Sequence, residues 1–190
     1  MSTRKKSVIR EWVESIVVAL LLAMVIRTFV VQAFKIPTGS MRTTLLEGDL
    51  ILVNKFIYGA KVPLTNFRFP AVRKPQRGDV VVFIYPQDPK KDFIKRLVGL
   101  PGESVEIRNS KIYINDQPLD VATFNRPYYN RGDFGLEGRK ILVPKDSYFV
   151  LGDNSENSQD SRFWGYVPAK NLLGNAMVIY WPPQRIRLIK

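Results

Sequence analysis

The sequence predicts a mostly β protein, built of antiparallel coiled sheets, that follows a single N-terminal transmembrane helix. Three observations support this fold class. A long apolar run lies near the N-terminus, between residues 12 and 34. From residue 49 onward, short runs rich in Val, Ile, Tyr and Phe alternate with Gly, Pro, Asn and Asp, as in strands and turns. Beyond the apolar run there is no amphipathic helix pattern, apart from a turn near residues 40–46.

The apolar run is long enough to cross a membrane. Its centre, Ile16–Ile26, contains no polar residue, and with its flanks it extends from Trp12 to Phe34. As a helix this stretch would be about 34 Å long, against about 30 Å for the hydrocarbon core of a bilayer. Basic residues at 4, 5, 6 and 10 predict that residues 1–11 form a cytoplasmic tail. Residues 35–190 would then form an extracytoplasmic domain.

Two alternatives compete with an uncleaved anchor. The pure apolar run is short enough to be a buried helix of a soluble protein. A basic start, an apolar core and Val31-Gln32-Ala33 also resemble a cleavable signal peptide, so a cut near Ala33 stays an alternative. Arg27 and Thr28 lie where the apolar core of such a peptide should continue. We therefore favour an anchor that is retained.

The strand pattern covers most of the body. Val105–Ile114 is expected to be a hairpin that turns at Asn109-Ser110, within an irregular insertion at about 103–146. The least regular part of this insertion is the Tyr-, Asn- and Gly-rich stretch 123–138. The pattern alone does not separate a sandwich from a partly closed barrel. We predict strands at Leu50–Asn54, Val80–Tyr85, Phe93–Val98, Val105–Arg108, Ile112–Ile114, Lys140–Val143, Tyr148–Leu151 and Ala176–Tyr180.

Composition narrows the function. The net charge of +12 suits an anionic neighbour, but the basic residues are scattered and no nucleic-acid-binding motif accompanies them, so we expect a lipid bilayer and no nucleic acid. The chain has no histidine and no cysteine. This excludes His-based triads, cysteine nucleophiles and the usual zinc-ligand sets, and we expect neither a metal nor a cofactor.

Ser40 and Lys95 are the nucleophile and base that the sequence offers. A serine hydroxyl is a weak nucleophile until a neighbour takes its proton, and a lysine can do so only when it is neutral. Lys95 lies among Phe93, Ile94, Leu97 and Val98, where desolvation would lower its pKa. Taken singly, a strand lysine usually points to water and a serine after Pro-Thr-Gly usually forms a turn or cap.

A third segment, Gly152–Arg162, is an unbroken run of polar and charged residues after a predicted strand. By itself it could be a solvated loop or a calcium loop. Its acidic residues do not follow the EF-hand spacing, and Arg162 ends the run, so the calcium interpretation is weak.

Together these segments resemble bacterial type I signal peptidase, the leader peptidase family. The resemblance extends in order from Phe34 to about Tyr180, and it implies the β-fold of that family. The matching segments are Ile36–Met41, Gly48–Val53, Arg77–Phe83, Lys95–Glu103 and Gly152–Arg162. Two departures are Thr43, where the family commonly has proline, and Ser155, where it commonly has a basic residue.

The resemblance also implies roles for single residues. Ser40 would be the nucleophile and Lys95 the general base, and the Ser158 hydroxyl would orient the lysine amine. The Ser40 backbone N–H and the Thr38 hydroxyl would form the oxyanion hole. Supporting residues would be Arg96, Asp153, Asp160 and Arg162, and the substrate pocket walls would be Ile36, Met41, Leu45, Val82 and Ile94.

The function that follows is a membrane-anchored serine endopeptidase that cleaves N-terminal signal peptides from exported preproteins. We expect a monomer in the bacterial cytoplasmic (inner) membrane, with its N-terminus in the cytoplasm and its catalytic domain on the outer face. Two alternatives are a self-cleaving regulator of the LexA type, which uses the same residue pair, and an anchored, non-enzymatic β binding module.

Overall fold

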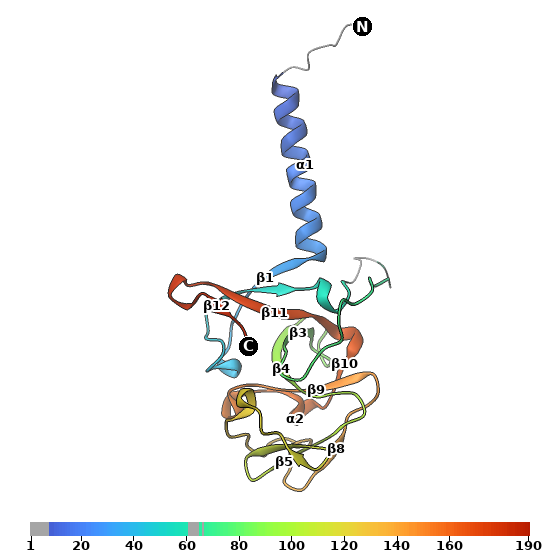
Figure 1. The fold of residues 1–190 in the computed structure, drawn as a ribbon, viewed down its shortest axis with the longest axis vertical. Coiled ribbons are helices and arrows are strands. Elements are labelled where there is room, and N and C mark those ends of the chain that lie inside the picture. The colour runs from blue at the N-terminus through green and yellow to red at the C-terminus, as the bar shows by residue number, and fades with distance from the viewer. Residues whose placement is uncertain (1–7, 61–64, 66) are drawn as a thin grey trace.

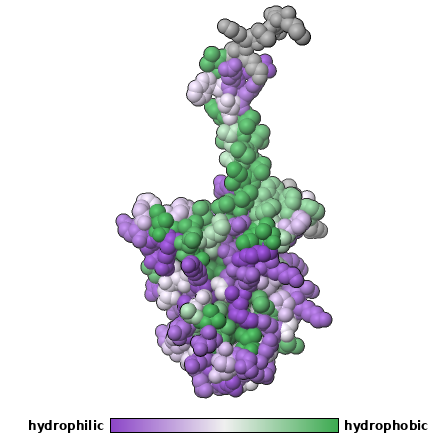
Figure 2. Space-filling model, in the orientation of Figure 1, coloured by the Kyte–Doolittle hydropathy of each residue, from purple (hydrophilic) through white to green (hydrophobic). Residues whose placement is uncertain are grey.

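The computed structural model describes residues 8–60, 65 and 67–190. Helix α1 (Val8–Phe29) stands away from the β body, and none of its residues is buried. Among the described residues it is the one helix long and apolar enough to cross a membrane, with a mean hydropathy of 2.0 (Figures 1 and 2). Of the predicted cytoplasmic tail, residues 1–7 lie outside the described residues and residues 8–11 belong to α1.

The predicted helical end at Phe34 is wrong. The helix ends at Phe29, and strand β1 (Val31–Lys35) follows after a single residue. This strand pairs in antiparallel register with β2 (Leu50–Asn54), Ala33 lying opposite Leu52. A local apolar pattern does not reveal backbone pairing with a distant strand. The sequence therefore predicts these residues as the last part of the helix.

The main sheet is antiparallel throughout and contains most of the predicted strands, which confirms the mostly β fold class (Figure 1). Register shifts in three of its strand pairings help the sheet to curl, since bulges increase the local twist. Its two shortest strands, of two residues each, are too short to leave a sequence pattern. In spatial order the strands are β1, β2, β11 (Leu172–Trp181), β3 (Val80–Ile84), β4 (Asp92–Gly99), β9 (Ser147–Leu151) and β10 (Val167–Pro168), with β12 (Arg187–Leu188) also on β11.

The sequence predicts an irregular insertion at 103–146, but much of it is regular, because it forms a second sheet at the end of the body opposite α1 (Figure 1). The expected hairpin is confirmed, and Asn109 and Ser110 have φ angles of 50° and 59°, which suit a two-residue turn. Residues 123–138 contain no strand. The strands in spatial order are β7 (Gln117–Pro118), β6 (Lys111–Ile114), β5 (Ser104–Arg108) and β8 (Ile141–Leu142).

Two of the hydrophobic clusters determine where the functional segments lie. One cluster joins the second sheet to β4 and β9 through Val98, Phe149 and Leu151. Another fixes the segment after β1 by burying Ile36, Met41 and Leu45 against β2, β3 and β11. As a result, the short 3₁₀ helix Gly39–Met41 and the middle of β4 lie next to each other.

Candidate active site

Ser40 and Lys95 meet although they are 55 residues apart in the sequence. Ser40 lies in the 3₁₀ helix Gly39–Met41, which Met41 holds to the core, and Lys95 lies in β4. The Lys95 Nζ donates a hydrogen bond of 2.8 Å to the Ser40 Oγ. Both side chains are buried, with 6% of Ser40 and 4% of Lys95 exposed.

The surroundings of Lys95 are apolar. Its Nζ lies 5.3 Å from the centre of the Phe93 ring and donates a second hydrogen bond, of 2.9 Å, to the carbonyl of Ile94. Burial lowers the pKa of Lys95 to about 8, although the more distant carboxylates of Asp160 and Asp153 oppose this change. An amine with this pKa is partly neutral near neutral pH, so it can accept a proton.

A cavity of about 290 Å³ opens beside the pair. The cavity lies between the segment before Met41 and the first half of β4. One edge of this half of β4 pairs with β3. The other edge of β4 pairs with β9, but only from Arg96 onward. The backbone edge of Asp92–Lys95 therefore faces the cavity, and no other strand in the described part of the chain pairs with it. The cavity is lined by Pro37, Thr38, Gly39, Ser40, Asp92, Phe93, Ile94, Lys95, Asn157 and Gln159.

Of the five predicted pocket walls, the structure brings only Ile94 to this cavity. The other four are at most 2% exposed and belong to the core cluster against which Ile94 packs: Ile36, Met41, Leu45 and Val82. These four side chains therefore pack in the core and do not line the cavity, and their role as walls of the substrate pocket stays a prediction. Thr38, by contrast, is exposed and lines the cavity.

Ser158 lies close to the nucleophile. It does not form the predicted hydrogen bond to the Lys95 amine. Its Oγ is buried and has no hydrogen-bond partner among the described residues. A Cβ added to Gly152 would lie 2.1 Å from this Oγ and 2.6 Å from the carbonyl oxygen of Ser40. Only glycine at 152 therefore leaves room for Ser158 beside the nucleophile segment.

Two fully buried ion pairs form the frame behind the site. Arg96 binds Asp153 through two hydrogen bonds of 2.8 and 2.6 Å, and also donates to the carbonyl of Gly78. Arg162 binds Asp160 through two bonds of 2.8 Å, while Asp160 also accepts from the Gly152 N–H. These charges are paired and hydrogen-bonded, as burial requires, so the four predicted supporting residues form two pairs.

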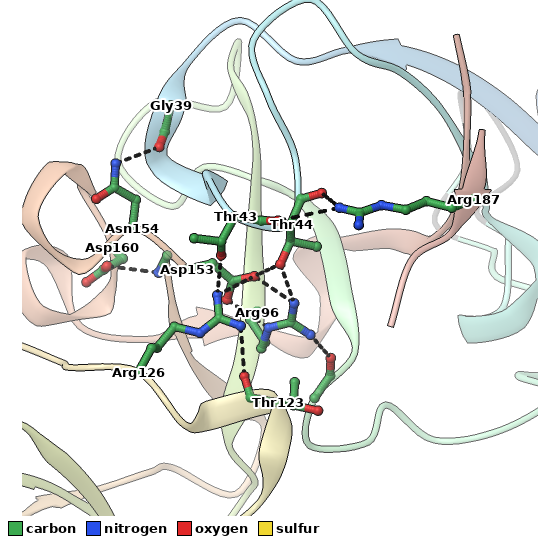
Figure 3. A network of polar contacts seen from close by, with 12 residues as sticks. Gly39, Thr43, Thr44, Arg96, Thr123, Arg126, Asp153, Asn154, Asp160 and Arg187 are labelled. Carbon is green, nitrogen blue, oxygen red and sulfur yellow. Dashed lines mark hydrogen bonds and ion pairs between the residues drawn. The ribbon is translucent and has the colours of Figure 1, made fainter. Parts of the chain in front are cut away.

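Sequence reasoning missed several residues that hold the site. The Asn154 N–H donates to the Ser40 carbonyl at 3.0 Å, and its side chain donates to the Gly39 carbonyl at 3.0 Å (Figure 3). Asn154 lies in the polar segment, which was a signal for it. Arg126, which contacts Thr43 and Asp153, comes from the insertion and had no such signal.

The two departures from the family pattern have local consequences. Thr43 has φ of 84°, an angle that a proline ring cannot adopt. Ser155 is buried, and its hydroxyl accepts hydrogen bonds from Arg162 and from the Tyr129 N–H.

Comparison of the sequence with a family model and with known proteins identifies one family. The model of the family described as signal peptidase, peptidase S26, matches residues 9–181. The signal peptidase I of Pseudomonas fluorescens is 35% identical over 217 residues, covering 96% of this chain and 76% of that protein. The signal peptidase I of Leptolyngbya laminosa is 40% identical over 187 residues, covering 95% and 83%. A crystal structure of a signal peptidase I from Enterococcus faecalis is 36% identical, with a TM-score of 0.44, and covers 55% of this chain and 98% of that one.

Proposed function

Because the chain belongs to the signal peptidase family S26 and is a serine endopeptidase, we propose that it cleaves signal peptides from preproteins with a Ser-Lys dyad. Ser40 is the nucleophile and Lys95 the general base. The observation that carries this proposal is the buried 2.8 Å hydrogen bond between the two side chains, in a chain without histidine. Family membership makes the alternative of a non-enzymatic binding module wrong.

The reaction follows from the chemistry of the pair. Neutral Lys95 accepts the Ser40 hydroxyl proton as the Oγ attacks the scissile carbonyl, which gives a tetrahedral intermediate and a lysine ammonium. The ammonium then donates this proton to the leaving amine as the peptide C–N bond breaks. In the second half, Lys95 takes a proton from water as the oxygen of that water attacks the acyl-serine ester. The bond from the acyl carbon to the Ser40 Oγ then breaks, the proton passes from Lys95 to this Oγ, and the cleaved chain leaves with a new carboxyl group.

The negative oxygen of each intermediate needs donors that are already in place. The Ser40 N–H and the Thr38 hydroxyl have this role in the proposal, and the position of Thr38 at the cavity supports it. Removing such a donor typically costs about 10²–10³-fold in kcat.

The substrate lies along the free edge of β4. An extended peptide can add as a strand to Asp92–Lys95, because this edge faces the cavity and pairs with none of the described strands there, although the Ile94 carbonyl already accepts a hydrogen bond from Lys95. The side chain just before the cut would rest on Ile94, and the resemblance implies that small residues are preferred there. Backbone pairing of this kind suits substrates of varied sequence.

Ser158 is the proposed orienting residue for Lys95. A buried hydroxyl without a partner is unfavourable, and a hydrogen bond to the Lys95 amine would satisfy it. We expect this hydrogen bond to form when the amine turns toward bound substrate. The ion pairs Arg96–Asp153 and Asp160–Arg162 stabilise the conformation of the segment around Ser158.

The membrane position is also part of the proposal. Helix α1 anchors the protein in the bacterial inner membrane, with the N-terminus in the cytoplasm and the catalytic domain on the outer face, as a monomer. The length and hydropathy of α1 support the anchor, and the basic residues at 4, 5, 6 and 10 support the orientation. Ser40 follows the helix end at Phe29 by eleven residues, across strand β1, which keeps it on the side of the body nearest the helix and suits substrates that are themselves held in the bilayer.

The test uses the full chain in detergent with a labelled preprotein. The parent should release the signal peptide, whereas Ser40→Ala and Lys95→Ala should not. Lys111→Ala removes an exposed strand lysine and is the matched control, with activity like the parent. Near-parental cleavage by either dyad variant would overturn the dyad, and an inactive parent would overturn the substrate assignment.

A further inference from the structure

The turn that follows Ser40 has an unfavourable backbone conformation. Thr43 has φ of 84°, in the left-handed region that branched side chains rarely adopt. Such a conformation persists only where surrounding contacts hold it. The contacts around Thr43 are therefore candidates for residues that determine where Ser40 lies.

The principal side-chain contact to Thr43 comes from the insertion. Arg126 donates a hydrogen bond of 2.8 Å to the Thr43 Oγ1 and one of 3.1 Å to the Thr123 carbonyl (Figure 3). On the other side of the turn, the Arg187 guanidinium donates to the Thr44 carbonyl at 2.7 Å. The Arg126 side chain is 23% exposed; its hydrogen bond to Thr123 is partly buried, whereas its hydrogen bond to the exposed Thr43 is open to water.

Arg126 also contacts Asp153, which precedes the residue that hydrogen-bonds to the nucleophile segment. Its Nη1 lies 3.3 Å from the Asp153 carboxylate, which also accepts a hydrogen bond from Thr44. The next residue, Asn154, binds the carbonyls of Gly39 and Ser40. One guanidinium thus connects the turn at Thr43 with the segment that begins at Asp153, as Figure 3 shows.

We propose that Arg126 is a positioning residue for the reaction, which holds Thr43 in its left-handed conformation and thereby fixes Ser40 against Lys95. This inference rests on the proposed Ser-Lys function, and it adds a residue of the insertion between β7 and β8 to those that support the dyad. Arg126 does not line the cavity beside Ser40, so it acts through the turn and not on the substrate. Its loss should reduce kcat and leave KM unchanged.

The experiment compares Arg126→Ala with the parent on a labelled preprotein. We expect kcat to fall by about tenfold and KM to stay within about twofold, because the chemical step depends on the placement of Ser40. The midpoint of the pH–rate profile should not move, since burial, not Arg126, lowers the pKa of Lys95. Arg139→Ala removes an exposed arginine of the same insertion and should match the parent. An unchanged kcat, or a loss expressed in KM, would overturn the proposal.

A second variant tests the route through Thr43. Glycine adopts φ near 84° without strain, so Thr43→Gly should no longer need the arginine. In that background, Arg126→Ala should cost less than about twofold in kcat. An equal loss in both backgrounds would show that Arg126 does not act through Thr43. Because Thr43→Gly introduces no new side chain, this comparison stays informative if Arg126→Ala alone folds poorly.

The two proposals can fail separately. If the parent cleaves preprotein, Ser40→Ala does not, and Arg126→Ala has parental kcat, the positioning role alone is wrong. If the parent cleaves no preprotein, the proposed function itself is wrong.

Discussion

Lys95 and Arg96 are consecutive residues of β4, and both side chains are buried on opposite faces of the strand. Arg96 meets the Asp153 carboxylate in two short hydrogen bonds, so its charge is matched. Lys95 donates hydrogen bonds to a serine hydroxyl and a carbonyl and forms no ion pair with a carboxylate of the described residues, and burial lowers its pKa to about 8. The comparison teaches that a cation that stays charged, such as Arg96, needs a counter-ion when it is buried, whereas a lysine buried without one can lose its proton and act as a base.

The largest expected effect is that of Lys95→Arg on activity. Arginine keeps a positive charge and a long stem but cannot release its proton, so cleavage should fall by about 10⁴-fold or more, as with Lys95→Ala. Initial rates on a labelled preprotein measure this, with Lys111→Arg as the matched control. If Lys95→Arg kept more than a few per cent of the rate, Lys95 would be a structural cation like Arg96.

The next effect is on stability, and it belongs to the other face of the strand. Arg96→Met leaves Asp153 as a buried charge with a lost partner and should lower the free energy of unfolding by about 3–5 kcal/mol. Urea unfolding of the full chain in detergent provides the measurement, and exposed Arg139→Met is the control. A loss below about 1 kcal/mol would mean that Arg126 and Thr44 satisfy Asp153 without Arg96.

Lys95→Met should have the opposite sign from Arg96→Met. The pKa of Lys95 is about 8 in the folded chain and about 10.4 when unfolded, so between these values the unfolded chain binds more protons and stability rises with pH. Below pH 8 the parent bears the full cost of burying the charge, of order 3 kcal/mol. Lys95→Met should therefore be more stable at pH 6 by up to that amount.

This advantage of Lys95→Met should decrease through pH 8–10 and disappear above about pH 10.5. The measurement is urea unfolding at a series of pH values for both proteins. A stability difference that does not depend on pH would contradict a lowered pKa for Lys95.

The smallest effect concerns how the neutral lysine is aimed. The parent kcat/KM should rise about tenfold per pH unit below a midpoint near pH 8, as Lys95 loses its proton. Ser158→Ala should lower this profile by about 10–100-fold, because the amine loses its proposed hydrogen-bond partner. Full activity in Ser158→Ala would show that the unpartnered hydroxyl has no part in aiming the amine.

Much of this arrangement could be predicted from local patterns. The strands around Lys95 and the hairpin at Asn109-Ser110 have side-chain alternation or turn residues that act over a few positions. Ser40 and Lys95 could be paired because a chain without histidine leaves few bases for a serine. The supporting residues could be found because they lie inside recognisable segments.

The rest depends on contacts between distant segments. Val31–Lys35 is apolar enough to continue the helix, and only its pairing with β2 makes it a strand. Ile36 and Val82 are apolar in the same way whether they line a pocket or fill the core. Arg126 is one of many scattered basic residues, and only the folded chain brings it to Thr43.

The junction of α1 and β1 has a mechanical consequence. One residue, Val30, separates them, and its N–H bonds back to the helix at Ile26 while its carbonyl accepts from Lys55 next to β2. Without a slack linker, the catalytic body has little freedom to swing or to rise on its stalk. In a bilayer, the reach from the membrane surface to the Ser40 hydroxyl is thus set by the fold itself. The protein would act as a fixed gauge, cutting only where a preprotein's own emerging segment brings a peptide bond to that height.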